Sequence, residues 1–179
     1  IIVSAKLQLL KVKSKFINAQ IIKTKNLNET LVKLNELKNN KYLISVIDTT
    51  AKNKAKGRSI IFIGNHSEDG NLEYSEKKKF SIPLNFFSFV LNKYTIKILS
   101  KIYYHFHKHN KKLKQNLDSF FYPLDKINNW NLLYGKNGFI QIQLLIEENN
   151  PEILICKILN FFQEKNQPSL LSAIKEFGP

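Results

Sequence analysis

Apolar and polar positions alternate along the first third of the chain as they do in β-strands. Runs rich in Ile, Val and Phe predict strands over residues 1–12, 16–24, 42–49 and 58–64. Between the second and third runs, leucines recur at helical spacing behind Asn26, which can cap a helix together with Glu29 three residues later. The pattern predicts a β-α-β unit followed by one further strand.

A similar order recurs near the C-terminus. Residues 138–146 alternate strictly, which places Gln141 and Gln143 on one face of a predicted strand and aliphatic residues on the other. The Asn-Pro pair at 150–151 suits the start of a helix, and residues 169–177 predict a last strand. Two such units predict an α+β fold with a ferredoxin-like antiparallel sheet and its helices on one face.

Between the two units, the aromatic-rich residues 84–105 predict a helical insert. The longest uncharged run, residues 80–92, falls short of the ~18 residues that would indicate a transmembrane helix. Two interpretations of the insert stay open. It is either a buried helix with surface lysines, or an interfacial helix that dips phenylalanines into lipid and keeps Lys93, Lys97 and Lys101 at the headgroups.

The charge and the cysteine content argue against two classes of protein, nucleic-acid-binding proteins and disulfide-rich proteins. The chain carries a net charge of +14, but Arg58 is the only arginine among its 28 basic side chains. Because arginine forms the bidentate contacts that nucleic-acid recognition favours, this composition argues against a nucleic-acid site. The single cysteine, Cys156, excludes a disulfide framework and fits a reducing, cytoplasmic setting.

Three histidines, His105, His107 and His109, alternate in a way that would suit a metal. Lysines surround them, however, and no carboxylate lies within several residues, so a divalent cation would be repelled. The sequence therefore predicts no metal site, and we expect His66 to be structural or exposed.

A series of short motifs in residues 120–143 and elsewhere resembles a known family. The motifs are Asp48, Gly57-Arg58-Ser59, Leu91-Asn92-Lys93-Tyr94-Thr95, Pro123-Leu124-Asp125, Trp130-Asn131, Tyr134-Gly135, Gly138-Phe139, Gln141-x-Gln143 and Lys175-x-Phe177-Gly178-Pro179. This series resembles the decaprenylphosphoryl-ribose oxidase family of FAD-linked sugar oxidases. The resemblance implies the cap domain of a vanillyl-alcohol-oxidase-type flavoenzyme. Residues 1–12 would end the FAD-binding domain, and residues 13–179 would form the substrate-binding cap of a protein that extends beyond both ends.

The resemblance also implies a reaction and a set of contacts. The parent would be an FAD-dependent oxidoreductase that oxidises a sugar hydroxyl, on a polyprenyl-phosphate pentose, as one half of an epimerisation completed by a partner reductase. The implied substrate-binding residues are Phe121, Tyr122, Gln141, Gln143, Lys175 and Phe177. Ile1 and Ile2 would lie at the edge of the FAD site. No catalytic residue is expected in this chain, which alone would be inactive because FAD is held mainly by another domain. Val46 stands where relatives carry an aromatic residue.

Two other functions remain open. One is the cap of a related oxidase that acts on a soluble sugar or an aldonolactone. The other is a non-enzymatic basic module that binds RNA or a membrane, which would show strongly salt-dependent binding. The expected location is the cytoplasm, with peripheral contact at the inner face of the membrane.

Overall fold

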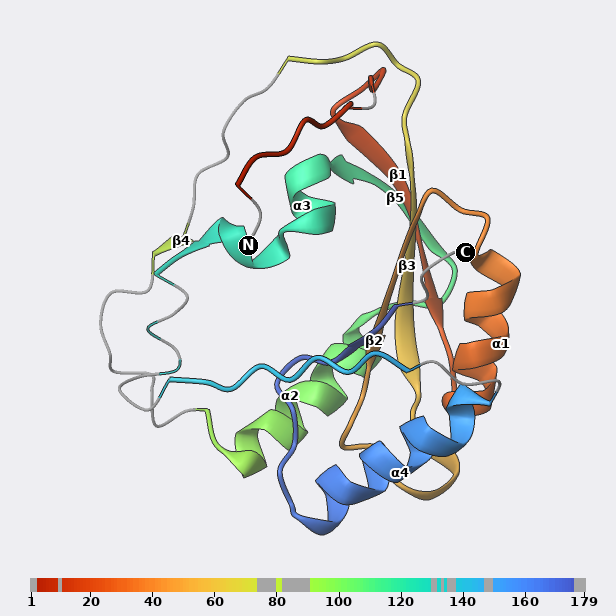
Figure 1. Cartoon of the computed structure of the whole chain (residues 1–179), viewed down its shortest axis with the longest axis vertical. Coiled ribbons are helices and arrows are strands. Elements are labelled where there is room, and N and C mark those ends of the chain that lie inside the picture. The colour runs from red at the N-terminus through yellow and green to blue at the C-terminus, as the bar shows by residue number, and fades with distance from the viewer. Residues whose placement is uncertain are drawn as a thin grey trace.

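The computed structural model describes residues 3–9, 11–73, 80–81, 91–129, 132, 134, 138–146 and 150–175. Over these residues the chain is an α+β protein with a five-stranded antiparallel sheet, a two-stranded sheet and four α-helices (Figure 1). The α+β class predicted from the sequence is thereby confirmed.

The large sheet has the strand order β5-β1-β3-β2-β7. Its strands are β1 (Phe16–Lys23), β2 (Tyr42–Ile47), β3 (Ser59–His66), β5 (Lys111–Asn116) and β7 (Ala173–Ile174). Every neighbouring pair is antiparallel. Since β1 and β2 both run antiparallel to β3, they are parallel to each other with β3 between them. Helix α1 (Leu27–Leu37) connects them in a split β-α-β unit, as the first half of the sequence predicts.

Helices α1 and α4 (Pro151–Glu164) cover one face of this sheet. Helix α1 begins where predicted, because the Asn26 side chain accepts a hydrogen bond from the Glu29 backbone N–H at 2.9 Å. Its leucines pack with residues of β2, β3 and α4 in two clusters of buried side chains, which contain Leu27, Ile47, Ile155 and Leu159 in one and Leu34, Ile61 and Ile63 in the other. This side of the sheet holds the larger part of the described core.

The opposite face carries helix α3 (Leu117–Phe121) and the end of helix α2 (Lys93–Phe106). Phe120 of α3 packs on Ile17 and Ala19 of β1, and the ring of His107, just after α2, lies edge-on to Phe62 at 5.5 Å. Gly64 makes the α3 contact close, because a Cβ there would lie 2.6 Å from the Phe120 ring. The expectation that helices cover only one face is therefore wrong.

Several predicted boundaries also differ. Residues 3–9 and 11–12 are exposed and form no strand, and residues 138–146 are extended but belong to neither sheet. The last strand is confined to β7. The lysine-rich strand β5 was not predicted. Helix α2 begins at Lys93, and the earlier part of the predicted insert, 84–90, lies outside the described residues.

Smaller elements connect these parts. They are the 3-10 helices η1 (Asn53–Ala55) and η3 (Pro123–Lys126), and the strands β4 (Phe80–Ser81) and β6 (Ile127–Asn128), which pair in parallel. Within the described part of the chain, no helix is long and apolar enough to cross a membrane.

Candidate functional site

The only arginine forms an ion pair at the end of the β2–β3 hairpin. Arg58 donates from Nη2 and Nε to Oδ2 of Asp48, at 2.8 and 3.0 Å. The other carboxylate oxygen accepts from the backbone N–H and the hydroxyl of Thr50, at 2.8 and 2.7 Å. Only 15% of the Arg58 side chain and 6% of the Asp48 side chain are exposed. The carboxylate is thus fully hydrogen-bonded in a site that water barely reaches.

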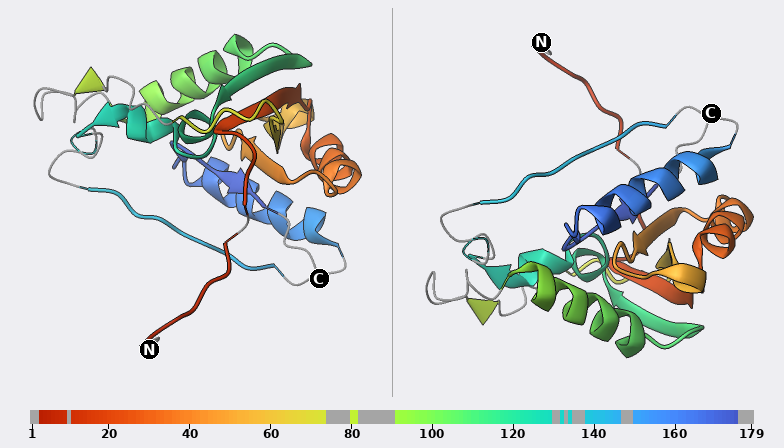
Figure 2. Two further views of the ribbon diagram at one scale, coloured as in Figure 1. Left: turned by 90° about the horizontal axis from the view of Figure 1, so that it is seen from above. Right: turned by 90° about the horizontal axis from the view of Figure 1, so that it is seen from below.

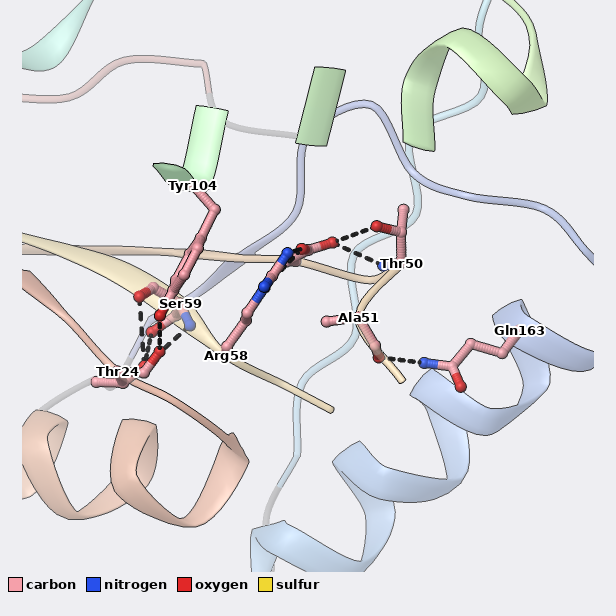
Figure 3. Close-up of polar contacts among 8 residues, drawn as sticks. Thr24, Thr50, Ala51, Arg58, Ser59, Tyr104 and Gln163 are labelled. Atoms are coloured by element: carbon pink, nitrogen blue, oxygen red, sulfur yellow. Dashed lines mark hydrogen bonds and ion pairs between the residues drawn. The ribbon is translucent and has the colours of Figure 1, made fainter. Parts of the chain in front are cut away.

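The same guanidinium holds helix α2 against the sheet (Figure 3). It stacks on the ring of Tyr104 at 4.1 Å, and the Tyr104 hydroxyl donates to the backbone oxygen of Thr24 at 2.9 Å. Burial raises the pKa of the Tyr104 phenol above its ordinary value, and the Arg58 charge partly opposes this. At the other side of the hairpin, the Gln163 side chain of α4 donates to the Ala51 carbonyl at 2.8 Å.

Beside this ion pair lies a cluster of three buried hydroxyls, Thr24, Thr30 and Ser59. Their oxygens lie 2.7, 2.9 and 3.1 Å apart, so each hydroxyl has a partner in the cluster. Gly57 allows α1 to approach it, because Gly57 has φ +74° and a Cβ there would lie 2.5 Å from Cβ of Leu27. The Gly57-Arg58-Ser59 motif therefore has a structural explanation: close approach, ion pair and buried hydroxyl.

A second motif of the resemblance explains how α2 begins. The Asn92 side chain accepts from the backbone N–H groups of Tyr94 and Thr95, at 2.9 and 3.1 Å, and the Thr95 hydroxyl accepts from the Asn92 N–H at 3.0 Å. This reciprocal arrangement is a capping box. The Asn92 and Thr95 positions of this motif therefore fix the start of a helix.

The face of the sheet that carries α3 leaves a row of β2 side chains partly open. Tyr42, Ile44 and Val46 alternate onto this face, and all three are half-buried. Phe121 stands edge-on to Tyr42 at 4.7 Å. The Tyr42 hydroxyl lies 2.9 Å from Nε2 of His66, whose Nδ1 lies 3.0 Å from the Ser14 carbonyl. We refer to Tyr42, Ile44, Val46 and Phe121 as the open-face row.

His66 is therefore structural, as predicted. Its Nδ1–H donates to the Ser14 carbonyl, which can only accept, and its Nε2 shares a hydrogen bond with the Tyr42 hydroxyl. No local pattern predicts this pairing, because Tyr42 and His66 meet only through the β2–β3 register.

The residues predicted to bind substrate lie in separate parts of the structure. Phe121 belongs to the open-face row, and the neighbouring Tyr122 is exposed. Gln141 and Gln143 are exposed on the extended segment 138–146, most of which Figure 2 shows apart from the sheet, although Ile146 at its end packs against the α1–α4 core. Lys175 is exposed one residue past β7. Phe177, Ile1 and Ile2 lie outside the described residues, so the roles of all these residues stay predictions.

The three clustered histidines occupy different surroundings. His105 is exposed on α2, His107 packs between the rings of Tyr103 and Phe62, and Nδ1 of His109 accepts a hydrogen bond from the Lys23 backbone N–H at 3.1 Å. In the described part of the chain, no three His, Cys, Asp or Glu side chains come together as metal ligands would. Cys156 is a free thiol packed beside the α1–α4 core.

Two comparisons bear on the class of protein. No protein-family model matches the chain. The fold alone defines an α+β protein whose sheet has one face covered by α1 and α4 and a second, partly open apolar face.

A sequence comparison is more specific. The chain is similar to the decaprenylphosphoryl-β-D-ribose oxidase of Mycolicibacterium smegmatis, with 29% identity over 108 residues, which is 60% of this chain. The matched stretch spans only 23% of that oxidase. The chain is therefore distantly related to part of an oxidase, in agreement with the motifs described above.

Proposed function

We propose that this chain is the substrate-binding portion of an FAD-linked oxidoreductase that oxidises a sugar hydroxyl. The substrate is a polyprenyl-phosphate pentose, and the oxidation is one half of an epimerisation that a partner reductase completes. The single observation that carries the proposal is the similarity to part of the Mycolicibacterium oxidase. A match to about a quarter of that protein is consistent with one domain of a larger enzyme.

The open-face row has the geometry of one side of a binding site, and it is not a complete active site by itself. Tyr42, Ile44 and Val46 present an apolar sheet surface that α1 and α4 do not cover. Such a surface fits one face of a planar aromatic ring such as the flavin. The residues that would hold the nucleotide phosphates are not found here, because the six glycines form no glycine-rich phosphate loop. With FAD bound, the flavin supplies the hydride acceptor.

The contribution of this chain is orientation. Gln141 and Gln143 carry amides that donate and accept hydrogen bonds, which suits sugar hydroxyls. Lys175 supplies a positive charge that would neutralise the substrate phosphate. Because these side chains are exposed, bringing them beside the open-face row requires the rest of the enzyme or the substrate to order them.

The test uses the full-length gene product that contains this chain. We expect it to copurify with a flavin, identified by its visible absorbance, and the flavin to be bleached anaerobically by a polyprenyl-phosphate pentose. Free pentose and aldonolactones are the comparison substrates. Bleaching by the free sugars and not by the lipid-linked one would move the assignment to a soluble-sugar oxidase. A protein without flavin that binds RNA in a salt-dependent manner would overturn the proposal.

A matched pair of variants tests the assigned contacts. Gln141→Leu should raise KM for the sugar substrate about tenfold or more, because a buried sugar hydroxyl would lose its partner. Gln167→Leu replaces another exposed glutamine, just beyond α4, and should leave KM unchanged. An equal KM for both variants would remove Gln141 from the site without removing the oxidase assignment, which the flavin test decides separately.

A further inference from the structure

Helix α2 exposes its apolar side instead of burying it. Tyr94, Ile98, Ile102 and Phe106 recur every four residues and so form a line along the helix, which we call the α2 strip. All four are exposed, Phe106 to 83%, and no residue of α2 is fully buried. In both views of Figure 2 the helix runs along the outer edge of the molecule. A surface helix that buried its apolar side against the sheet would show the reverse pattern.

The side of α2 that faces the rest of the protein is more polar than the α2 strip. Tyr104 reaches the Thr24 carbonyl and Arg58, and Lys97 donates to the Asn166 side chain at 2.6 Å. These polar contacts fix the rotation of the helix about its axis. These contacts of Tyr104 and Lys97 therefore hold the α2 strip outward, and the helix is not loosely attached.

The ionisable residues of α2 and of the segment that follows it include no carboxylate. From residue 93 to residue 117 the sequence holds seven lysines, three histidines and no acidic residue. Lys93 and Lys101 are exposed and each precedes a residue of the strip, so they line one border of it, about 100° around the helix. The Lys93 ammonium lies 5.4 Å from the centre of the Tyr94 ring. The helix therefore presents aromatic and aliphatic side chains with cations beside them.

We propose that α2 docks on the surface of an anionic phospholipid bilayer, lying parallel to it with the α2 strip in the acyl boundary. Lysines beside the strip can extend to the headgroups while their methylene stems stay among apolar groups. At 14 residues α2 is too short to span a bilayer, which requires about 20. Tyr94 and Tyr103 carry the amphipathic rings that favour the interface between lipid and water.

A protein partner fits this surface less well. Another protein domain would match the charge of Lys93 and Lys101 only if it placed carboxylates opposite both of them. A bilayer containing anionic lipid supplies negative charge wherever the lysines lie. The proposal goes beyond the sugar oxidase assignment, because the docking depends on neither flavin nor substrate.

The test is sedimentation of the full-length gene product with vesicles of phosphatidylcholine, with and without phosphatidylglycerol. We expect binding only when phosphatidylglycerol is present, weakening as salt is raised. Ile98→Glu should reduce binding at least tenfold. Ile153→Glu on α4 is the matched control, since Ile153 is 55% exposed and Ile98 57%, and it should bind like wild type. Lys93→Gln should weaken binding roughly fivefold.

Two further measurements separate docking from other outcomes. Ile98→Cys should react with a water-soluble maleimide before vesicles are added and be protected afterwards. Protection without vesicles would overturn the proposal, because another part of the protein would then cover the strip. Equal binding to neutral and anionic vesicles, or equal loss in Ile98→Glu and Ile153→Glu, would also overturn it. Thermal unfolding of each variant confirms that the protein remains folded.

Discussion

The Arg58–Asp48 ion pair is expected to be the most consequential polar contact of the described structure, and Arg58→Ala tests it. The substitution leaves the Asp48 carboxylate, 6% exposed, without its cation. Removing one partner of a buried pair costs about 3–5 kcal/mol. Since Thr50 still donates two hydrogen bonds to the other oxygen, we expect the lower end, ~3 kcal/mol. The lost stacking on Tyr104 is included in this figure.

The assay is urea unfolding of the chain followed by far-ultraviolet circular dichroism. In a thermal melt of the same variant, a loss of ~3 kcal/mol in the free energy of unfolding corresponds to a decrease in Tm of roughly 6–12 °C for a chain of this size. Arg58→Lys keeps the charge but not the paired N–H donors, so it should cost ~1–2 kcal/mol. Lys33→Ala is the control, because it breaks the exposed Lys33–Glu36 pair on α1 and should cost less than ~0.5 kcal/mol.

A double-mutant cycle decides whether the ion pair itself carries the effect. In the Asp48→Asn background no carboxylate is left unpaired, so Arg58→Ala should cost ~1–3 kcal/mol less than in wild type. Equal costs for Arg58→Ala in the two backgrounds would refute the reasoning. So would a cost for Arg58→Ala no larger than that for Lys33→Ala. Equal costs would mean that Arg58 stabilises the fold through contacts other than Asp48, such as the Tyr104 ring, and a cost as small as that of Lys33→Ala would mean that the pair contributes little.

Three other predictions follow from single contacts. Gly57→Ala should lower the free energy of unfolding by ~3 kcal/mol or more in urea, because the new Cβ would lie 2.5 Å from Cβ of Leu27. Gly70 also has a positive φ but faces open space, so Gly70→Ala should cost only ~1 kcal/mol. Ser45→Ala should leave stability unchanged or raise it by up to ~1 kcal/mol, since the buried Ser45 hydroxyl has no hydrogen-bond partner among the described residues; a clear loss would indicate a partner. Folding raises the pKa of Tyr104 above its ordinary value of 10.0. The protonated phenol therefore contributes stability below pH 10, and this contribution is lost as the pH rises through the raised pKa. A plot of Tm against pH should therefore fall less steeply on the alkaline side in Tyr104→Phe.

Local patterns predicted the first half of the fold well. Strands β1, β2 and β3 and helix α1 follow from alternation, leucine spacing and the Asn26 cap, because each signal is contained within its own segment. Strand β5 was not predicted, because Leu113 is its only strongly apolar residue and the strand therefore shows no alternation of apolar and polar positions. As an edge strand it needs no second apolar face, and its lysines suit an edge.

The alternating segment 138–146 shows what a local pattern lacks. Its amide and aliphatic faces are those of a strand, but a strand also requires a neighbour with free backbone groups. In the described structure β5 and β7 form the two edges of the large sheet, and segment 138–146 pairs with neither. Pairing partners are set by the tertiary fold. The Arg58–Tyr104 and Tyr42–His66 contacts were missed for the same reason, because they join residues 46 and 24 positions apart.

Two groups can be distinguished among the motifs behind the resemblance once they are placed in the structure. Asp48, Gly57-Arg58-Ser59 and Asn92 with Thr95 close the β2–β3 hairpin, tie α2 to it and begin α2. These residues maintain the architecture, so this part of the resemblance concerns the fold more than the substrate.

The second group, Gln141-x-Gln143 and the residues from Lys175 onward, lies where this chain has exposed or undescribed positions. Under the proposed function, substrate recognition depends on how the open-face row is completed by other parts of the enzyme. A variant of the first group should lower stability and activity together, while a variant at Gln141 should change KM alone. That difference separates the part of the resemblance that describes the fold from the part that describes the chemistry.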